Sequence, residues 1–147
     1  MWGKATQIDE HTWTMKVQSD KRMATAQEIF SALNSYRKEK GKGTLTWDDN
    51  LARFAEERAL FFTTNGKLDG HAGFQSFTSG DGFEKVGFNA LGENSSYGYF
   101  LEGVHLIEWI YAGDPPHDLN QLHSEWTHVG IGVNGTSTDL IFGGKTR

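Results

Sequence analysis

The sequence contains no cysteine. This absence excludes disulfide bonds, a thiolate metal site and a cysteine nucleophile. It does not by itself identify the compartment in which the protein works.

Basic residues are also scarce. Lysine and arginine together number 14 against 19 aspartates and glutamates, which gives a net charge of -5 and an isoelectric point near 5.6. Nucleic-acid-binding domains carry a basic patch or stripe. We therefore expect no nucleic-acid partner.

Long apolar runs are missing as well. No stretch reaches the roughly 18 apolar residues of a membrane span, and the N-terminus lacks the apolar region of a signal peptide. We expect no membrane span, and a chain that is either cytosolic or the mature part of an exported protein.

Proline is rare and glycine is frequent. Two prolines accompany 18 glycines, a balance typical of many loops and tight turns rather than of disorder. Aromatic residues make up 13% of the chain and supply enough bulk for a core.

The 147 residues predict one domain over residues 1–147, with an extended N-terminal arm over about residues 1–22.

Two early segments have helical periodicity. Apolar residues at three- and four-residue spacing predict a helix over residues 24–40, where Thr25 and a glutamate three residues later resemble a capping box. A second helix is predicted over about residues 49–65, capped by Asp48 and ended by Asn-Gly. Arg58 lies on its core side but ends a charged Glu-Glu-Arg run that we expect to be solvated.

The rest of the chain has weaker patterns. Residues 12–17 alternate as in a half-buried strand. Residues 66–92 are rich in glycine and have no clear period, whereas residues 97–112 predict a long apolar helix. Two runs near the end, residues 128–133 and 138–142, predict strands joined as a hairpin.

One stretch carries the candidate chemistry. Glu93 follows the glycine-rich segment, where irregular chain is expected to pass into the third helix. His71 lies upstream and His117 lies downstream, in the first turn of a short helix predicted after two prolines. Neither histidine lies on an apolar helical stripe, so the three residues are candidates for a metal site or an acid–base site.

A second pair is less informative. His105 and Glu108 are three residues apart on the predicted third helix and share a face. They do not form the His-Glu-x-x-His zinc motif, because no second histidine follows. We expect a surface pair or a pair that supports the site.

Taken together, these features resemble the CAP superfamily, which comprises cysteine-rich secretory proteins, antigen 5 and pathogenesis-related 1 proteins. The resemblance runs from about residue 26 to residue 142. It rests on the order and spacing of these motifs: Leu33-Asn34-x-Tyr36-Arg37, Leu45-x-Trp47-Asp48-x-x-Leu51-x-x-x-Ala55, His71, Gly92-Glu93-Asn94, Trp109, His117-x-x-Asn120 and Val129-Gly130-Ile131-Gly132-Val133. The lack of cysteine makes the chain similar to the bacterial SCP-like branch.

The resemblance implies an α+β fold. It is an α-β-α sandwich in which a three-stranded, mainly antiparallel sheet lies between helical layers. It also implies a cleft with two histidines and two acids, of which His71, His117 and Glu93 match three. Members of the family are mostly exported, and they bind divalent metals, commonly zinc at the two histidines.

The second acid of the family is missing. It falls three residues after the helix tryptophan, where this chain has Ala112. Glu108, one turn earlier, and Asp114, just beyond, are the candidates to replace it. The departure weakens an acid–base role more than it weakens metal binding.

Three functions remain open. The first is an exported, non-enzymatic binding module with zinc at His71 and His117, whose partner is a small molecule, a lipid or a cell-surface ligand. The second is a zinc-dependent hydrolase with Glu93 as the general base. The third is a lipid or sterol carrier, with apolar walls from Phe74, Phe77, Phe83 or Phe88. We favour the first, because a hydrolase also needs an oxyanion-stabilising group and we can name none in the sequence.

Overall fold

The computed structural model describes residues 5–7, 13–15 and 20–147. The helices are α1 (Ala26–Glu39), α2 (Asp49–Asn65), α3 (Ala72–Ser79), α4 (Gly82–Val86), the π-helix η1 (His105–Tyr111) and α5 (Pro115–Leu122). The strands are β1 (Ala5–Gln7), β2 (Trp13–Met15), β3 (Thr46–Trp47), β4 (Phe88–Ser96), β5 (Trp126–Asn134) and β6 (Ser137–Thr146). Among these residues, no helix combines the length and the apolar character that a membrane crossing requires.

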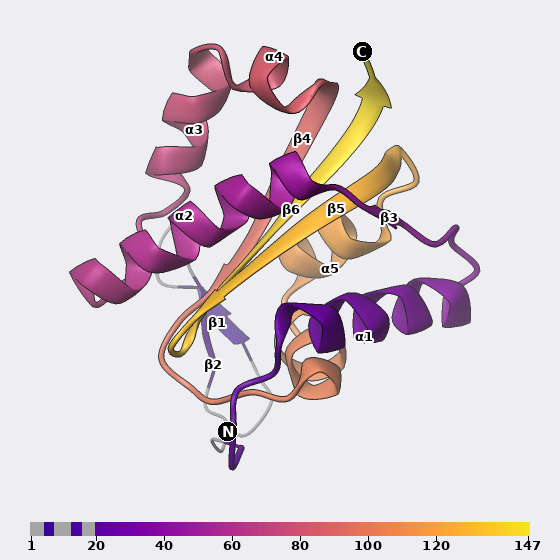
Figure 1. Ribbon diagram of the computed structural model, residues 1–147. Coiled ribbons are helices and arrows are strands. Elements are labelled where there is room, and N and C mark those ends of the chain that lie inside the picture. Colours follow the sequence, from indigo (N-terminus) through magenta and orange to yellow (C-terminus); the bar gives the residue numbers. More distant parts are fainter. Residues whose placement is uncertain (1–4, 8–12, 16–19) are drawn as a thin grey trace.

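The central sheet has the strand order β3-β5-β6-β4. The strands β5, β6 and β4 pair antiparallel, and β3 adds parallel to β5. The sheet therefore has four strands rather than the three that the family resemblance implied, because the two-residue strand β3 adds to the antiparallel strands β5, β6 and β4. The predicted α+β class is confirmed, with α2 on one side of the sheet and α1 and α5 on the other (Figure 1).

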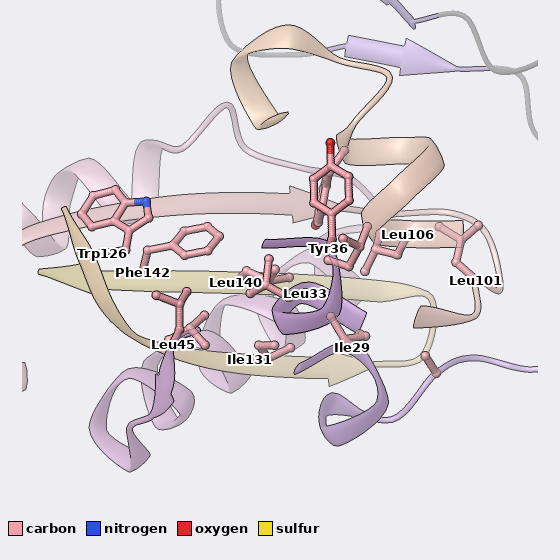
Figure 2. Close-up of a cluster of buried hydrophobic side chains, with 14 residues drawn as sticks. Ile29, Leu33, Tyr36, Leu45, Leu101, Leu106, Trp126, Ile131, Leu140 and Phe142 are labelled. Atoms are coloured by element: carbon pink, nitrogen blue, oxygen red, sulfur yellow. The ribbon is translucent and has the colours of Figure 1, made fainter. Parts of the chain in front are cut away.

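The strand β6 divides the core into two clusters. Leu140 and Phe142 pack with Ile29 and Leu33 of α1 and with η1 in the larger cluster (Figure 2). Ile141 points to the other face and packs against α2 and α4. Because successive side chains of a strand alternate between faces, residues of β4 paired with Ile141 also face α2.

The first two helices and the hairpin are confirmed. The helix α1 begins after Thr25, whose hydroxyl accepts a hydrogen bond from the backbone N–H of Glu28 (3.2 Å). The helix α2 begins after Asp48 and ends at Gly66, which has a left-handed conformation (φ 70°). The strands β5 and β6 pair from Asn134 and Ser137 onward. In the N-terminal arm, β2 pairs with β1, and the other residues of the strand expected over residues 12–17 lie outside the described ranges.

Two expectations about the middle of the chain are wrong. Residues 66–92 are not irregular, since they form α3, α4 and the first half of β4. These helices have only eight and five residues, which is too short for a periodic signal. The third helix does not begin at residue 97, because β4 continues to Ser96 and a turn follows through Gly98 (φ 110°). The chain first becomes helical at Gly103, and it is wound as a π-helix from His105.

The helix α2 lies unusually close to β5. A Cβ atom added at Gly130 would lie 2.0 Å from the backbone nitrogen of Ala52. A Cβ at Gly132 would lie 2.4 Å from the backbone carbonyl carbon of Ala55. These two glycines let the helix backbone rest directly on the sheet, and they fix the height of Arg58 above it.

We predict that Gly130→Ala destabilises the fold by about 1–3 kcal/mol or more, because the added methyl group overlaps backbone that cannot rotate away. The free energy of unfolding from urea titration measures the effect. The matched control is Gly43→Ala, where a Cβ meets nothing within 4 Å. Equal stabilities for the two variants would contradict the close packing of α2 on β5.

Candidate functional site

The candidate site is built around β4, the edge strand of the sheet. Glu93 pairs with Ile141 and Asn94 pairs with Leu140. Glu93 therefore faces α2, and Asn94 faces α5, on the opposite side. Glu93 lies within a strand and not at the start of a helix as expected, because residues 88–96 pair along almost their whole length with β6.

The Glu93 carboxylate accepts hydrogen bonds from two side chains. Arg58 donates from Nε to Oε2 (2.8 Å) and from Nη2 to Oε1 (3.0 Å). The Nδ1 atom of His71 lies 2.7 Å from Oε1. Burial alone would raise the pKa of Glu93, but the hydrogen bonds from His71 and Arg58 outweigh it and lower the pKa to about 2.

Arg58 joins this carboxylate to a second one. Its Nη1 donates to Oδ2 of Asp69 (2.6 Å), and its Nη2 donates to Oδ1 (2.8 Å). The prediction that Arg58 is solvated is wrong, because its side chain is only 5% exposed. Burial would lower the arginine pKa, yet the hydrogen bonds that Arg58 donates to Asp69 and Glu93 raise it. The guanidinium is therefore a fixed positive charge between α2, β4 and the segment before α3.

His71 has an unusual backbone conformation. It precedes α3 with φ 67°, a left-handed region that histidine occupies more often than most residues but still uncommonly. Asp69 stabilises this turn, since its Oδ2 also accepts from the backbone N–H of Gly73 (3.0 Å). The imidazole is 21% exposed while the carboxylate that holds it is 1% exposed.

His117 is held in a similar way on the other side of β4. Its Nδ1 lies 2.7 Å from Oδ2 of Asp114, the N-cap residue of α5. Asn94 of β4 donates to the backbone carbonyl of His117 (2.9 Å). Asn120 then donates to the carbonyl of Glu93 (3.1 Å) and to Oδ1 of Asn94 (3.0 Å). Neighbouring residues of one strand thus position the two histidines.

The two candidates for the missing acid differ in placement. Asp114 is buried and contacts His117 directly. Glu108 is exposed, and its charge acts on Tyr36, whose pKa is raised by burial, by Asp118 and by Glu108. Of the two, only Asp114 is seen to orient a predicted site histidine.

The pairing of His105 with Glu108 stays a prediction. His105 contacts Asp20, with Nδ1 2.8 Å and 2.9 Å from its two carboxylate oxygens. Asp20 also accepts from the backbone N–H of Glu102 (2.7 Å). Within the described ranges, Asp20, Glu102 and His105 are the one trio whose potential metal ligand atoms all lie within 4.8 Å of one another. The His105 imidazole and the backbone N–H of Glu102 both contact the Asp20 carboxylate, while the Glu102 side chain is exposed.

The chemistry of His71 and His117 fits a metal that binds imidazole. Each ring has Nδ1 against a buried carboxylate, so Nε2 is the atom that would ligate. Metal-binding histidines commonly use their other ring nitrogen in this way, which fixes the tautomer and the ring orientation. Glu93 suits this orienting role better than that of a base, because its carboxylate is buried, hydrogen-bonded and weakly basic.

Sequence reasoning missed Arg58 and Asp69 as members of this network. The only available signal was that Arg58 fell on the core side of an apolar helical stripe, where a charged residue is rarely buried without a partner. Asp69 gave no signal, since it is an acid in a glycine-rich segment. Asp139, buried in β6 beside Glu93, was also missed.

The comparisons with known proteins identify the family. Residues 30–142 match the cysteine-rich secretory protein (CAP) family, and the chain belongs to it. No curated protein is significantly similar to the sequence.

Three solved structures are similar to this chain. An extracellular protein containing a SCP domain from Bacillus anthracis is 27% identical, with a TM-score of 0.72 over 82% of this chain and 40% of that one. A cysteine-rich secretory protein from Staphylococcus aureus is 20% identical, with a TM-score of 0.66 over 82% and 38%. An outer surface protein from Borrelia burgdorferi is 19% identical, with a TM-score of 0.67 over 88% and 100%. The last two show a common fold alone. The chain spans about 40% of the length of the first two.

We predict that Arg58→Met lowers the free energy of unfolding at pH 7 by about 3–5 kcal/mol, because it leaves the Glu93 and Asp69 carboxylates buried without their cation. Calorimetric or urea unfolding measures the loss. Arg53→Met, on the exposed side of the same helix, is the control and is expected to change stability by less than about 0.5 kcal/mol. A small loss for both variants would show that the network contributes little.

Proposed function

We propose that this CAP domain is an exported, non-enzymatic binding module that holds one divalent metal ion, zinc, through His71 and His117. The observation that carries the proposal is the pair of oriented imidazoles, each fixed at Nδ1 by a carboxylate 2.7 Å away. Two neutral imidazoles, completed by water or another oxygen ligand, suit the four-coordinate preference of zinc. When bound, the ion would supply a Lewis-acidic centre beside the edge strand.

Export is proposed from the relatives. The Bacillus anthracis structure, at 27% identity, is described as an extracellular protein. The absence of cysteine agrees with bacterial relatives of this kind better than with the disulfide-rich secreted branch of the family.

The hydrolase alternative is less well supported. A general base works best with a pKa near the operating pH and with access to the attacking water. The Glu93 side chain is 1% exposed, and its pKa is lowered to about 2. The second carboxylate, Asp114, is likewise directed to an imidazole.

Three of the four phenylalanines proposed as walls of a lipid carrier pack inside the protein. Phe77 stacks on Phe54 with ring centroids 3.7 Å apart, and Phe88 of β4 is buried in the cluster with α2 and α4. Phe74 packs against the same cluster. These side chains stabilise the contact between α3, α4 and α2.

We predict one zinc site in a calorimetric titration of the metal-free protein. Replacing His71 and His117 together by alanine is expected to abolish binding, because both imidazole ligands are removed. The control is His105→Ala, which disrupts the trio with Asp20 and Glu102 and is expected to leave zinc affinity unchanged. Binding that survives the double substitution but disappears in His105→Ala would assign the metal to the trio instead.

We further predict that Asp114→Asn weakens zinc binding by about 10–100-fold, because the neutral amide orients the His117 imidazole less strongly. Asparagine remains a good N-cap, so thermal unfolding is expected to change little.

Glu93→Gln tests the equivalent contact to His71. A zinc-dependent turnover of peptide, ester or glycan substrates that disappears in Glu93→Gln, with zinc still bound, would favour the hydrolase.

A further inference from the structure

Asp139 is the least expected charged residue in the fold. It lies in the middle of β6 and is completely buried. It pairs with Ser95, two residues from Glu93 on β4, and Glu93 pairs with Ile141. The register places the Asp139 and Glu93 side chains on the same face of the sheet as diagonal neighbours, within reach of each other.

The two oxygens of Asp139 have different surroundings. Its Oδ1 accepts a hydrogen bond from the Ser95 hydroxyl (2.7 Å). Its Oδ2 is buried, and no described residue donates to it. The Glu93 carboxyl lies within hydrogen-bonding reach of the Asp139 carboxyl. Two ionised carboxylates cannot hydrogen-bond, whereas one proton between them makes such a bond and satisfies Oδ2.

The surrounding donors decide which residue holds that proton. Glu93 accepts N–H bonds from Arg58 and from His71, which favour its ionised form. Within the described ranges, Asp139 has one neutral hydroxyl donor and no cationic ion-pair partner. This difference in donors separates the pKa values of the two acids, so that Glu93 stays ionised and Asp139 stays protonated.

We propose that Asp139 is a neutral carboxylic acid in the folded protein, and that it donates a hydrogen bond from Oδ2 to Glu93. It acts as a positioning residue, because its hydrogen bond holds the Glu93 carboxylate towards Arg58 and His71. The inference does not depend on metal binding.

The charged and titratable groups around Asp139 support this assignment. They are Glu93 on β4, Arg58 on α2 and Tyr111 on η1. Burial and the negative charge of Glu93 raise the pKa of Asp139 well above its usual value, and Arg58 opposes them without cancelling the shift. An ionised Asp139 would place three carboxylates around one guanidinium in a buried cluster.

The test is the pH dependence of unfolding for wild type and Asp139→Asn, measured in urea between pH 5 and 9. An acid with a raised folded-state pKa stabilises the fold fully below its unfolded pKa, and this stabilisation is lost as the pH rises towards the folded pKa. Asparagine mimics the protonated acid at every pH, since its amide can donate to Glu93 and its carbonyl can accept from Ser95. The ratio of unfolding constants, wild type over variant, is expected to rise by up to tenfold per pH unit.

Other results of this experiment would overturn or change the proposal. A ratio that stays constant above pH 5 would overturn the proposal, because it would mean that Asp139 is ionised in both states. The exposed substitution Asp81→Asn is the matched control and should give that constant ratio. Asp139→Leu should be less stable than Asp139→Asn, since leucine leaves Ser95 and Glu93 without a partner. Equal stability of Asp139→Leu and Asp139→Asn would show that Asp139 contributes only by packing.

A spectroscopic measurement keeps the proposal testable if Asp139→Asn does not fold. Infrared spectra of wild-type protein with carboxyl-labelled aspartate should show the carbonyl band of a protonated carboxyl group at pH 7. Exposed aspartates are ionised at that pH and do not contribute to the band. An infrared spectrum without it would overturn the proposal.

Discussion

The burial of one guanidinium is the constraint on which this site depends. Arg58 is enclosed between Asp69 and Glu93, and it joins α2, the segment before α3 and the edge strand β4. Desolvating such ions is costly, and the cost is offset only when geometry and hydrogen bonding are nearly complete. Here both carboxylates receive two N–H bonds from the same cation. The segment that carries His71 is therefore held to α2 by the ion pair between Asp69 and Arg58.

The edge strand β4 supplies residues to both sides of the site. Successive residues of β4 face opposite sides of the sheet, so Glu93 contacts the His71 side and Asn94 contacts the His117 side. His117 lies in the first turn of α5, and His71 is the residue that directly precedes α3. The imidazoles are thus supported by a strand and by helix ends, and not by mobile loops, which is the arrangement that holds ligating groups most accurately.

Elements whose ends are defined by neighbouring residues were predictable from the sequence, whereas contacts between residues far apart in the sequence were not. The helices α1 and α2 were predictable from adjacent residues, because Thr25, Asp48 and Gly66 define their ends locally. The strand β4 was not, since both of its faces are covered and its buried residues 92–96 do not alternate. Arg58 and Glu93 are 35 residues apart in the sequence, and no local pattern could connect them. The family motifs pointed to His71, Glu93 and His117 and included Asn94 and Asn120, but they did not point to Arg58 and Asp69.

The N-cap residue of α5 combines two structural roles. Asp114 caps α5 and faces the His117 imidazole three residues later, so one carboxylate serves both the helix end and the histidine. Placed there, it is directed to His117. Acid–base catalysis by two carboxylates requires both groups to face a common substrate. In this chain each faces its own imidazole, so the arrangement favours holding two ring nitrogens in place over transferring protons.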